Sequence, residues 1–385
     1  MQGERALKIY ISKPSILTGV GDIKALLNAS LSNKNSLSKK EFLNKEFMVS
    51  TIKESLEKIP PNFSSYLYSR TDEIAFNAIL GLKDEIQRAI KRHGRENVAV
   101  VTATTTSGIE ENFKIFKNGT FDKDKFQVEK NEFSNPSELI KEFFGLKNLS
   151  YGISTACTSG LKAISEGANL IKSGICKAAI VGGVDSINAL TLFGFDSLSI
   201  LSDKKCAPFS KERDGTNLGE GAAFMLLDSD EISPFVVKSF CSNSDAFHIT
   251  TPRKDGFYQA KLIRDTLKRV NLSEVDYVNL HATGTVANDE MESNAVNLTL
   301  PNTPASGIKQ IIGHTLGAAG AIEIALCLEL LGSNKTPPFH NISTIDESLA
   351  KINLLKAPIK ANIKNALSLS FAFGGDNAAM IVGME

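Results

Sequence analysis

The order of apolar and polar positions along the chain predicts short buried strands alternating with amphipathic helices. Apolar, β-branched runs typical of strands buried on both faces occur at residues 8–16, 98–102, 178–181, 222–227, 235–240, 275–280, 304–308, 367–371 and 378–382. Apolar side chains recur every three to four positions at residues 71–92, 258–270, 289–298 and 317–331, which predicts helices. We therefore predict an α/β fold with a mostly parallel sheet covered on both faces.

The same strand–helix rhythm occurs twice. Residues 228–234 interrupt it, and it restarts with the strand at 235–240. We take this break as the boundary between two similar halves, residues 1–228 and 229–385, and interpret the repetition as an internal duplication. Residues 33–62 are rich in Lys, Ser and Glu, and we expect surface helices and loops there.

Residues 149–174 combine a strand, a cysteine and a helix. Residues 149–156 are apolar and β-branched, Cys157 follows directly, and a helical apolar repeat then runs on to Gly174. A helix N-terminus favours negative charge, so it lowers the pKa of a thiol towards neutrality. That is the setting of a nucleophilic thiolate. From this stretch alone, a small buried core cysteine remains the alternative.

Two of the five histidines stand at the ends of predicted elements. His281 follows the strand at 275–280 and opens the sequence HATGT, while His314 lies in the turn IIGHTLGAAG before a helix. Functional groups of parallel α/β sheets gather beyond the carboxyl ends of the strands. We therefore expect both imidazoles in a functional site, with a core or loop histidine as the alternative for each.

The helix at 317–331 is apolar on almost all sides, so we expect it to be buried. Glu323 falls in its middle, and a buried carboxylate needs a charged or hydrogen-bonding partner. Lys309, five residues before His314, is the candidate. Such a pair would lie close to His314 and hold that ring in one tautomer. A surface lysine and a frayed helix are the alternative.

Composition narrows the classes of function. Lys plus Arg and Asp plus Glu both number 43, so the zero formal charge favours neither nucleic acid nor a membrane surface as partner. The five cysteines are scattered without CxxC spacing, so we expect neither disulfides nor a zinc site. The first residues lack a signal-peptide pattern, and no apolar run reaches the roughly 18 residues of a membrane span. We expect a cytoplasmic protein.

Four motifs in this order resemble the elongating β-ketoacyl-acyl-carrier-protein synthases. They are STACTSG around Cys157, HATGT at His281, KQIIGHTLGAAG at 309–320 and FAFGGDNAA at 371–379. A further block, PFSKERDGTNLGEGAA at 208–223, resembles the central part of this family, and the resemblance runs from about residue 71 onwards. It implies a thiolase-like fold, with two similar βα halves in a five-layer α-β-α-β-α sandwich.

The resemblance also implies catalytic roles. Cys157 corresponds to the nucleophile that takes an acyl chain from a carrier-protein thioester. His281 and His314 correspond to the pair that polarises malonyl thioester during its decarboxylation. Lys309 and Glu323 correspond to the lysine and the buried carboxylate of the same site. The implied reaction is a decarboxylative Claisen condensation that elongates a fatty acid or a related polyene or polyketide chain.

Further residues of the expected site follow from the same resemblance. Phe373 corresponds to an aromatic gate beside the cysteine, and its backbone N–H would form an oxyanion hole with that of Cys157. Thr283 and Thr285 correspond to the threonines that contact the pantetheine arm. The resemblance implies no metal and no redox cofactor.

The implied partners are acyl carrier protein, loaded with acyl or malonyl groups, and a second subunit. We expect a homodimer, with a heterodimer as the alternative. Because the carrier protein is strongly acidic in this family, its docking surface should be basic. Lys204 and Lys205 are candidates for it, and a solvated pair of charges is the alternative.

The sequence also departs from the family pattern. Ala282 and Ala372 stand where glycine is usual, and Asp376 stands where a small hydroxyl residue is usual. TTTSGIEE and GGVDSINALTLFGFDSL resemble the branch associated with aryl-polyene-type lipids, so that branch and fatty acid elongation both stay open. Two rival functions remain. A thiolase would carry a second cysteine in the final glycine loop, and a non-catalytic chain-length factor would lack Cys157.

Overall fold

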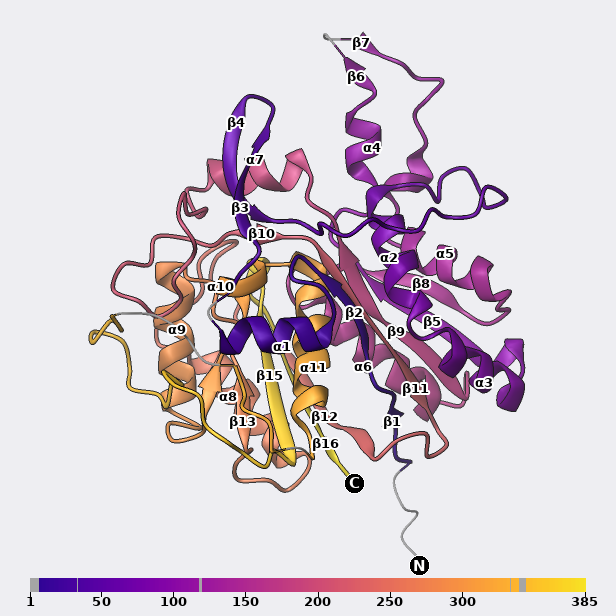
Figure 1. The fold of residues 1–385 in the computed structure, drawn as a ribbon. Helices are drawn as coiled ribbons and strands as arrows, with labels where there is room; N and C mark the ends of the chain where they lie inside the picture. The colour runs from indigo at the N-terminus through magenta and orange to yellow at the C-terminus, as the bar shows by residue number, and fades with distance from the viewer. Residues whose placement is uncertain (1–6, 33, 118–119, 333, 339–343) are drawn as a thin grey trace, which may run out of the picture.

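The structure is a computed structural model that describes residues 7–385 apart from 33, 118–119, 333 and 339–343. Within these described residues, eleven strands form one sheet in the order β14-β13-β15-β16-β12-β1-β11-β9-β5-β8, with β2 beside β11. In Figure 1 the N-terminal part of this sheet lies on the right and the C-terminal part, ending in yellow, lies on the left.

In the N-terminal half, helices cover both faces of the sheet. Its strands are β2 (Ser15–Thr18), β5 (Val98–Ala103), β8 (Ser150–Ile153), β9 (Ala178–Asp185) and β11 (Gly221–Asp228). Its helices are α2 (Arg70–Leu80), α3 (Lys83–His93), α5 (Asn135–Phe144) and α6 (Ser159–Lys172). Val98 and Val100 pack towards α2, α3 and α5, whereas Ala99 and Val101 pack towards α6, because successive side chains of a strand face opposite sides.

The C-terminal half repeats this plan. Its strands are β12 (Phe235–Ser244), β13 (Tyr277–Asn279), β14 (Ala305–Ser306), β15 (Asn365–Phe371) and β16 (Asp376–Met384). Its helices are α8 (Phe257–Lys268), α9 (Val286–Asn297), α10 (Lys309–Ile312) and α11 (Ala319–Leu330). Leu367 and Ile381 pack in the core with α8 and α9, while Ala366 and Val382 pack in the core with α11.

Helices α6 and α11 pack against each other between the two parts of the sheet. A Cβ atom on Gly160 would lie 2.6 Å from the backbone nitrogen of Ala321, and one on Gly320 would lie 2.9 Å from Leu161 Cγ. Only glycine permits this approach of the two helices. The layers are therefore outer helices, sheet, α6 with α11, sheet, outer helices, which is the predicted five-layer sandwich.

The two halves are joined at the centre of the sheet. Strand β1 (Tyr10–Ile11) pairs with both β11 and β12, and the predicted boundary after residue 228 falls at the end of β11. The division into two domains at this boundary stays a prediction. The expected mostly parallel sheet is wrong in part, because β5 and β13 pair in parallel with their neighbours but β9–β11, β12–β16 and β15–β16 are antiparallel.

Three predicted elements differ from the structure. The helix expected at 71–92 is split at Gly81 and Leu82 into α2 and α3. Gly81 lies close to β2, since a Cβ atom there would be 2.3 Å from Ser15 Oγ. The strand expected at 8–16 is divided between β1 and β2 by Pro14, which cannot donate to the ladder. The helix expected at 317–331 begins with a 3₁₀ turn, Leu316–Ala318, before α11.

The prediction of surface helices within residues 33–62 is also wrong. Residues 37–50 form a hairpin of β3 (Leu37–Phe42) and β4 (Lys45–Ser50), and β4 also pairs with β10 (Leu218–Gly219). The Phe47 ring packs edge-on against Phe193 of α7 (Ala189–Ser197), with ring centroids 5.3 Å apart. This tertiary contact, which local sequence cannot reveal, stabilises the charged strands.

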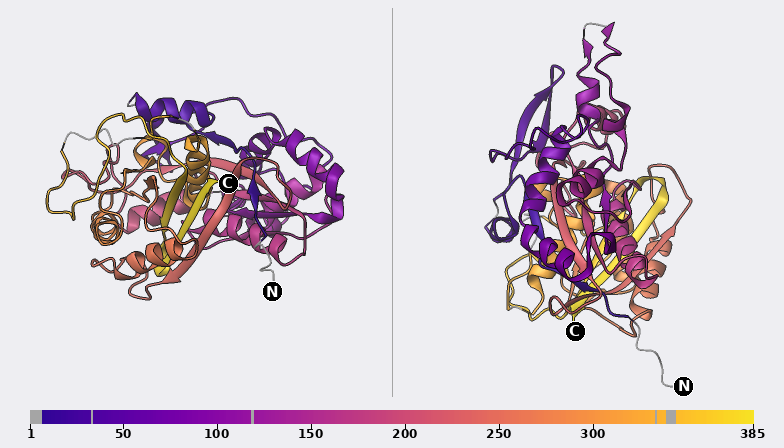
Figure 2. Two further views of the ribbon diagram at one scale, coloured as in Figure 1. Left: turned by 90° about the horizontal axis from the view of Figure 1, so that it is seen from below. Right: turned by 90° about the vertical axis from the view of Figure 1, so that its right-hand side faces the viewer.

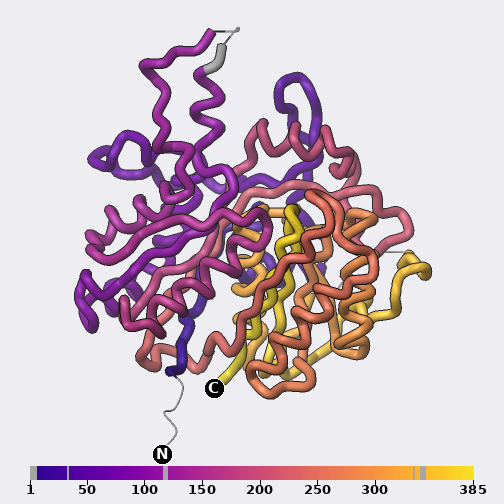
Figure 3. The backbone as a smooth tube through the Cα atoms, turned by 180° about the vertical axis from the view of Figure 1, so that it is seen from behind, coloured from indigo at the N-terminus to yellow at the C-terminus, as the bar shows by residue number. Residues whose placement is uncertain are grey.

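A second projection leaves the body beside this hairpin. It contains α4 (Ile109–Phe113), β6 (Phe116–Lys117) and β7 (Thr120–Phe121), and we call residues 109–133 the arm. Figures 1 and 2 show that the arm and the hairpin project from the same end of the molecule, and Figure 3 shows the C-terminus at the opposite end. The short helix α1 (Ile23–Leu31) lies against α10 and α11. Among the described helices, none has the length and apolarity to cross a bilayer.

Candidate active site

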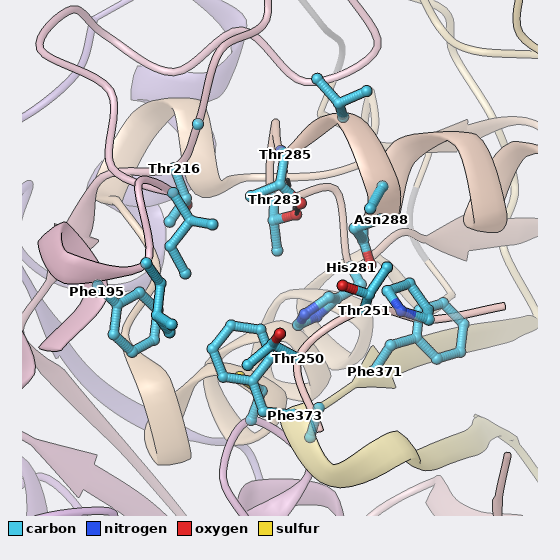
Figure 4. A pocket seen from close by; sticks show the side chains of 18 of the residues that line it. Phe195, Thr216, Thr250, Thr251, His281, Thr283, Thr285, Asn288, Phe371 and Phe373 are labelled. Carbon is cyan, nitrogen blue, oxygen red and sulfur yellow. Dashed lines mark hydrogen bonds between the residues drawn. The ribbon is translucent and has the colours of Figure 1, made fainter. Parts of the chain in front are cut away.

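One cavity of about 330 Å³ is lined by both halves of the chain. Cys157, His281 and His314 lie in its wall, together with Phe195 and Phe373. Figure 4 shows His281 deep in the cavity, with the rings of Phe195 and Phe373 on one side. The structure thus brings together three chemistry-bearing residues that are far apart in the sequence.

Cys157 occupies a strained turn between β8 and α6. The preceding residue, Ala156, has φ 53°, a left-handed conformation that costs energy for a residue with a side chain. Hydrogen bonds hold the turn: Ser159 Oγ donates to the Ala156 carbonyl at 2.6 Å and accepts the Thr155 N–H at 2.8 Å. Ser370 of β15 donates to the Cys157 carbonyl at 2.8 Å. The two halves therefore meet at the cysteine itself.

His314 faces the cysteine. Its Nε2 lies 2.9 Å from Cys157 Sγ, and its Nδ1 accepts the backbone N–H of Leu316 at 3.2 Å. Because Nδ1 accepts a hydrogen bond, we assign the proton of the neutral ring to Nε2. The ring therefore donates towards the sulfur, which favours the thiolate over the thiol.

The structure does not bear out the expected lowering of the Cys157 pKa. Burial raises the pKa of Cys157 to about 12, while the charge of Lys309 acts in the opposite direction. A helix N-terminus alone is therefore too weak a reason to expect a resting thiolate. The sulfur needs the His314 N–H and the end of α6 to stabilise its anion at the moment of reaction.

Lys309 and Glu323 form a fully buried ion pair, with Nζ and Oε1 2.6 Å apart and side-chain exposures of 1% and 2%. The lysine also donates to the His281 carbonyl at 2.5 Å and lies 3.4 Å from His281 Nδ1. The expectation that this pair orients His314 is therefore wrong. It fixes His281, because Lys309 is the first residue of α10 and its side chain reaches back to His281, which follows β13 in the chain.

Both imidazoles present the same donor atom to the cavity. An ammonium at Nδ1 of His281 places the proton of that neutral ring on Nε2, as in His314. The two rings stand perpendicular, with centroids 5.3 Å apart. Burial, and then the charge of Lys309, hold the pKa of both rings well below the usual 6.5, so both are neutral N–H donors.

The Cys157 sulfur and a ring nitrogen from each of these histidines lie within 4.8 Å of one another, a spacing that a metal ion also accepts. A metal would need lone pairs where the assigned tautomers direct N–H groups. The donor set fits a developing negative charge on a substrate oxygen better than it fits a cation.

Two buried carboxylates that sequence reasoning missed support the site. Glu292 of α9 accepts the backbone N–H groups of His281 at 2.6 Å and Ala282 at 2.8 Å, and burial raises its pKa to about 8. Asp185, at the end of β9, accepts the N–H groups of Thr105 at 2.9 Å and Gly317 at 2.7 Å. Asp185 ends a strand, which is a usable signal, whereas Glu292 lies in a polar helix that gives none.

The other predicted residues are placed as follows. Thr283 and Thr285 line the cavity with their hydroxyl oxygens 3.0 Å apart, and Figure 4 shows them opposite Phe373. Phe373 packs against Phe195, with ring centroids 5.6 Å apart. Lys204 and Lys205 are exposed, and Lys204 Nζ lies 3.9 Å from Asp214, a residue of the cavity lining.

Comparison with known families agrees with this geometry. Residues 81–232 match the model of the β-ketoacyl synthase N-terminal domain, and residues 235–343 match that of the C-terminal domain. The chain belongs to the β-ketoacyl synthase family.

Individual relatives give the same result. A putative polyketide β-ketoacyl synthase 1 of Streptomyces cyaneus is 32% identical, over 64% of this chain and 64% of that protein. A 3-oxoacyl-[acyl-carrier-protein] synthase 2 of Rhizobium meliloti is 34% identical, over 62% and 61%. The chain thus spans less than two thirds of the length of these curated relatives. A chain of a solved complex of a ketosynthase with its chain length factor, from Xenorhabdus doucetiae, matches with 32% identity, a TM-score of 0.92 and coverage of 100% of this chain and 100% of that chain.

Proposed function

We propose that this chain is a 3-oxoacyl-[acyl-carrier-protein] synthase. It condenses an acyl group held on Cys157 with malonyl-acyl-carrier-protein, with loss of CO₂, in the elongation of a fatty acid or of a related polyene or polyketide chain. The observation that carries this proposal is the convergence of Cys157, His281 and His314 within 4.8 Å in one cavity.

In the first half-reaction, the Cys157 sulfur attacks the carbonyl carbon of an acyl-carrier-protein thioester. The negative charge that develops on the carbonyl oxygen is stabilised by the backbone N–H groups of Cys157 and Phe373. The thiol of the carrier protein then leaves with the proton that Cys157 has lost. Its acyl chain remains on the cysteine as a thioester.

In the second half-reaction, the malonyl carboxylate leaves as CO₂ and its bonding electrons form an enolate. The Nε2–H groups of His281 and His314 donate to the enolate oxygen, which is why both rings must stay neutral yet protonated at that atom. The enolate carbon attacks the acyl carbonyl, a carbon–carbon bond forms, and the Cys157 thiolate is released.

The cavity disfavours the rival functions. Among the described residues that line it, Cys157 is the single cysteine, so the second cysteine of a thiolase is missing. A non-catalytic chain-length factor has no use for a nucleophile with an imidazole N–H 2.9 Å from its sulfur. An acyl-transfer enzyme accounts for both features.

We propose that the carrier protein docks beside the exposed Lys204 and Lys205, near the cavity lining at Asp214. Replacing both lysines by Glu should raise the KM for carrier protein, flatten its salt dependence and leave kcat unchanged. An unchanged KM would move the docking surface elsewhere.

We also propose that the chain pairs with a second ketosynthase-fold subunit, in a homodimer or with a chain-length-factor-like partner. Two features support this. Strand β8 ends the sheet and leaves one edge open for pairing, and the arm exposes the apolar side chains of Phe113, Phe126, Val128 and Phe133. Light scattering of the chain alone distinguishes the possibilities: a dimer mass indicates self-pairing, and a monomer that doubles on addition of a partner indicates a heterodimer.

The test of the proposed activity is the site of acylation. After incubation with acyl-carrier-protein, mass spectrometry should find the acyl adduct on Cys157. An adduct on Cys176, Cys206, Cys241 or Cys327 would contradict the proposal. The matched variant is Cys157→Gln, which should lose condensation but still release CO₂ from malonyl-carrier-protein, since the two imidazole donors remain.

A further inference from the structure

Asp376 stands where the family usually has a small hydroxyl residue, and the structure gives its carboxylate two partners on another element. It is the first residue of β16, directly after the turn that carries Phe373. Lys162 Nζ lies 2.6 Å from its Oδ2 and 2.8 Å from its Oδ1, and the Thr158 hydroxyl donates to Oδ2. The Asp376 side chain, from the C-terminal half, therefore holds Lys162 of α6 and Thr158 at the start of that helix.

Those two partners are close to the nucleophile. Thr158 directly follows Cys157 at the N-cap position of α6, and its hydroxyl also lies 2.8 Å from the carbonyl of Thr155. Lys162 is one turn further along the same face of the helix. The negative charge of Asp376 thus sits at the positive end of α6, where the helix dipole also favours it.

The other end of the contact is the turn around Phe373. The N–H of Ala372 donates to the Asp376 carbonyl at 2.8 Å and closes the turn, and the N–H of Gly374 donates to the Ile249 carbonyl at 2.7 Å. Gly374 and Gly375 both have positive φ, 82° and 74°, so the turn depends on conformations that glycine adopts freely. A glycine-rich turn gains fixed geometry from a side-chain anchor at its end.

We propose that Asp376 is a positioning residue whose ion pair with Lys162 and hydrogen bond with Thr158 fix the Phe373 turn against the N-terminus of α6. This contact sets the spacing between the backbone N–H groups of Cys157 and Phe373, which must both face the oxygen of the acyl thioester. A hydroxyl at this position satisfies Thr158 but leaves Lys162 without its anion. The inference rests on the proposed function, because it uses the oxyanion role of these two N–H groups.

The contact acts on the two acyl-transfer steps and not on decarboxylation. Attack on the acyl thioester and transfer to the enolate both use the two N–H groups. Decarboxylation uses His281 and His314, which are held by Lys309, Glu323 and the Leu316 N–H instead. A residue with a merely structural role would lower acylation and decarboxylation together.

The experiment measures acylation of Cys157 and malonyl decarboxylation separately in Asp376→Asn, which keeps the shape and removes the charge. We expect the rate of Cys157 acylation to fall about tenfold, less than the ~10²–10³ loss on removing an oxyanion donor outright. Malonyl decarboxylation, measured with the same change in the Cys157→Gln background, should change less than about twofold. The matched control is Asp265→Asn, which breaks the exposed Lys261–Asp265 pair on α8 and should change neither rate.

Lys162→Met provides a second variant that leaves Asp376 in place, should Asp376→Asn fold poorly. It should show the same selective loss, and the double variant should be no slower than either single one, because the two residues act as a unit. Equal losses in acylation and decarboxylation, or unchanged acylation in both variants, would overturn the inference. A wild-type protein that is not acylated on Cys157 would instead overturn the proposed function.

Discussion

The turn before α6 and the turn before α11 have similar positions in the two halves but are held by different forces. Cys157 is held mainly by neutral hydrogen bonds from Ser159 and Ser370, and the nearby Lys162–Asp376 pair is about a quarter exposed. The turn before α11 carries His314 and is spanned by Lys309–Glu323, a pair removed from water that also holds His281.

The difference matches what each turn must do. A nucleophile only has to be presented, and several weak contacts can share that task. The histidines must stay neutral donors at one fixed atom. Burial lowers the pKa of His281, and the buried cation beside its Nδ1 lowers it further and secures the tautomer. The cost is a buried charge that becomes unpaired when either partner is lost.

The largest effect is expected from breaking the Lys309–Glu323 pair. Glu323→Ala should lower the free energy of unfolding by about 3–5 kcal/mol, because it leaves the buried Lys309 charge unpaired. Glu323→Gln keeps the shape of the side chain, so it should lower the decarboxylation rate more than it lowers the free energy of unfolding. Denaturant unfolding measures this, with Glu329→Ala as control on the same helix. Its partner Lys335 is more than a third exposed, so that change should cost at most about 1 kcal/mol. Equal losses in the two Ala variants would mean that burial does not make the difference.

The next effect separates the two turns kinetically. His281→Ala or His314→Ala should lower malonyl decarboxylation about 10²–10³-fold, the usual cost of one donor to a developing oxyanion. Cys157 should still accept an acyl group in both variants, which intact-mass measurement would show. If either variant condenses at the rate of the unmodified protein, the assignment of both histidines as donors to the enolate oxygen is wrong.

The pH dependence tests the neutral state of the rings. Their pKa values in the folded protein lie well below 6.5, so the unfolded chain binds more protons as the pH falls through that value. Stability should therefore be fully present above pH ~6.5 and be lost below it, by up to about 1.4 kcal/mol per pH unit for each ring. Decarboxylation should stay flat from pH 8 to 6.5. Thermal unfolding against pH, compared with a variant that lacks both histidines, measures this contribution.

The smallest effect concerns backbone strain, which the Cys157 turn shares with the segment that follows His281. Ala282, after His281, has φ 47°, as Ala156 has φ 53° before Cys157. Ala282→Gly relieves a left-handed conformation that costs about 1–2 kcal/mol, and this offsets the buried methyl group and the entropy of glycine. We expect unfolding free energy to change by less than about 1 kcal/mol. Ala295→Gly, at a buried position in the last turn of α9, has no strain to relieve and should be more destabilising.

The sequence by itself determined the local features of the site. The strand–cysteine–helix order at Cys157, the histidines at element ends and the apolar helix around Glu323 all follow from periodicity and turn residues, because these are short-range properties of the chain. The pairing of Lys309 with Glu323 could be predicted as well, since few cations stand near enough to a carboxylate that cannot reach water.

Only the tertiary structure decided which groups meet. It placed Lys309 on His281 rather than on His314, brought Glu292 of α9 under the His281 backbone, and set Asp376 against Lys162, 214 residues away in the chain. It also turned the charged residues 37–50 into a hairpin that packs on α7 and raised the pKa of Cys157 by burial. Desolvation and long-range hydrogen bonds depend on the groups that surround a residue in space, and local sequence pattern carries no record of them.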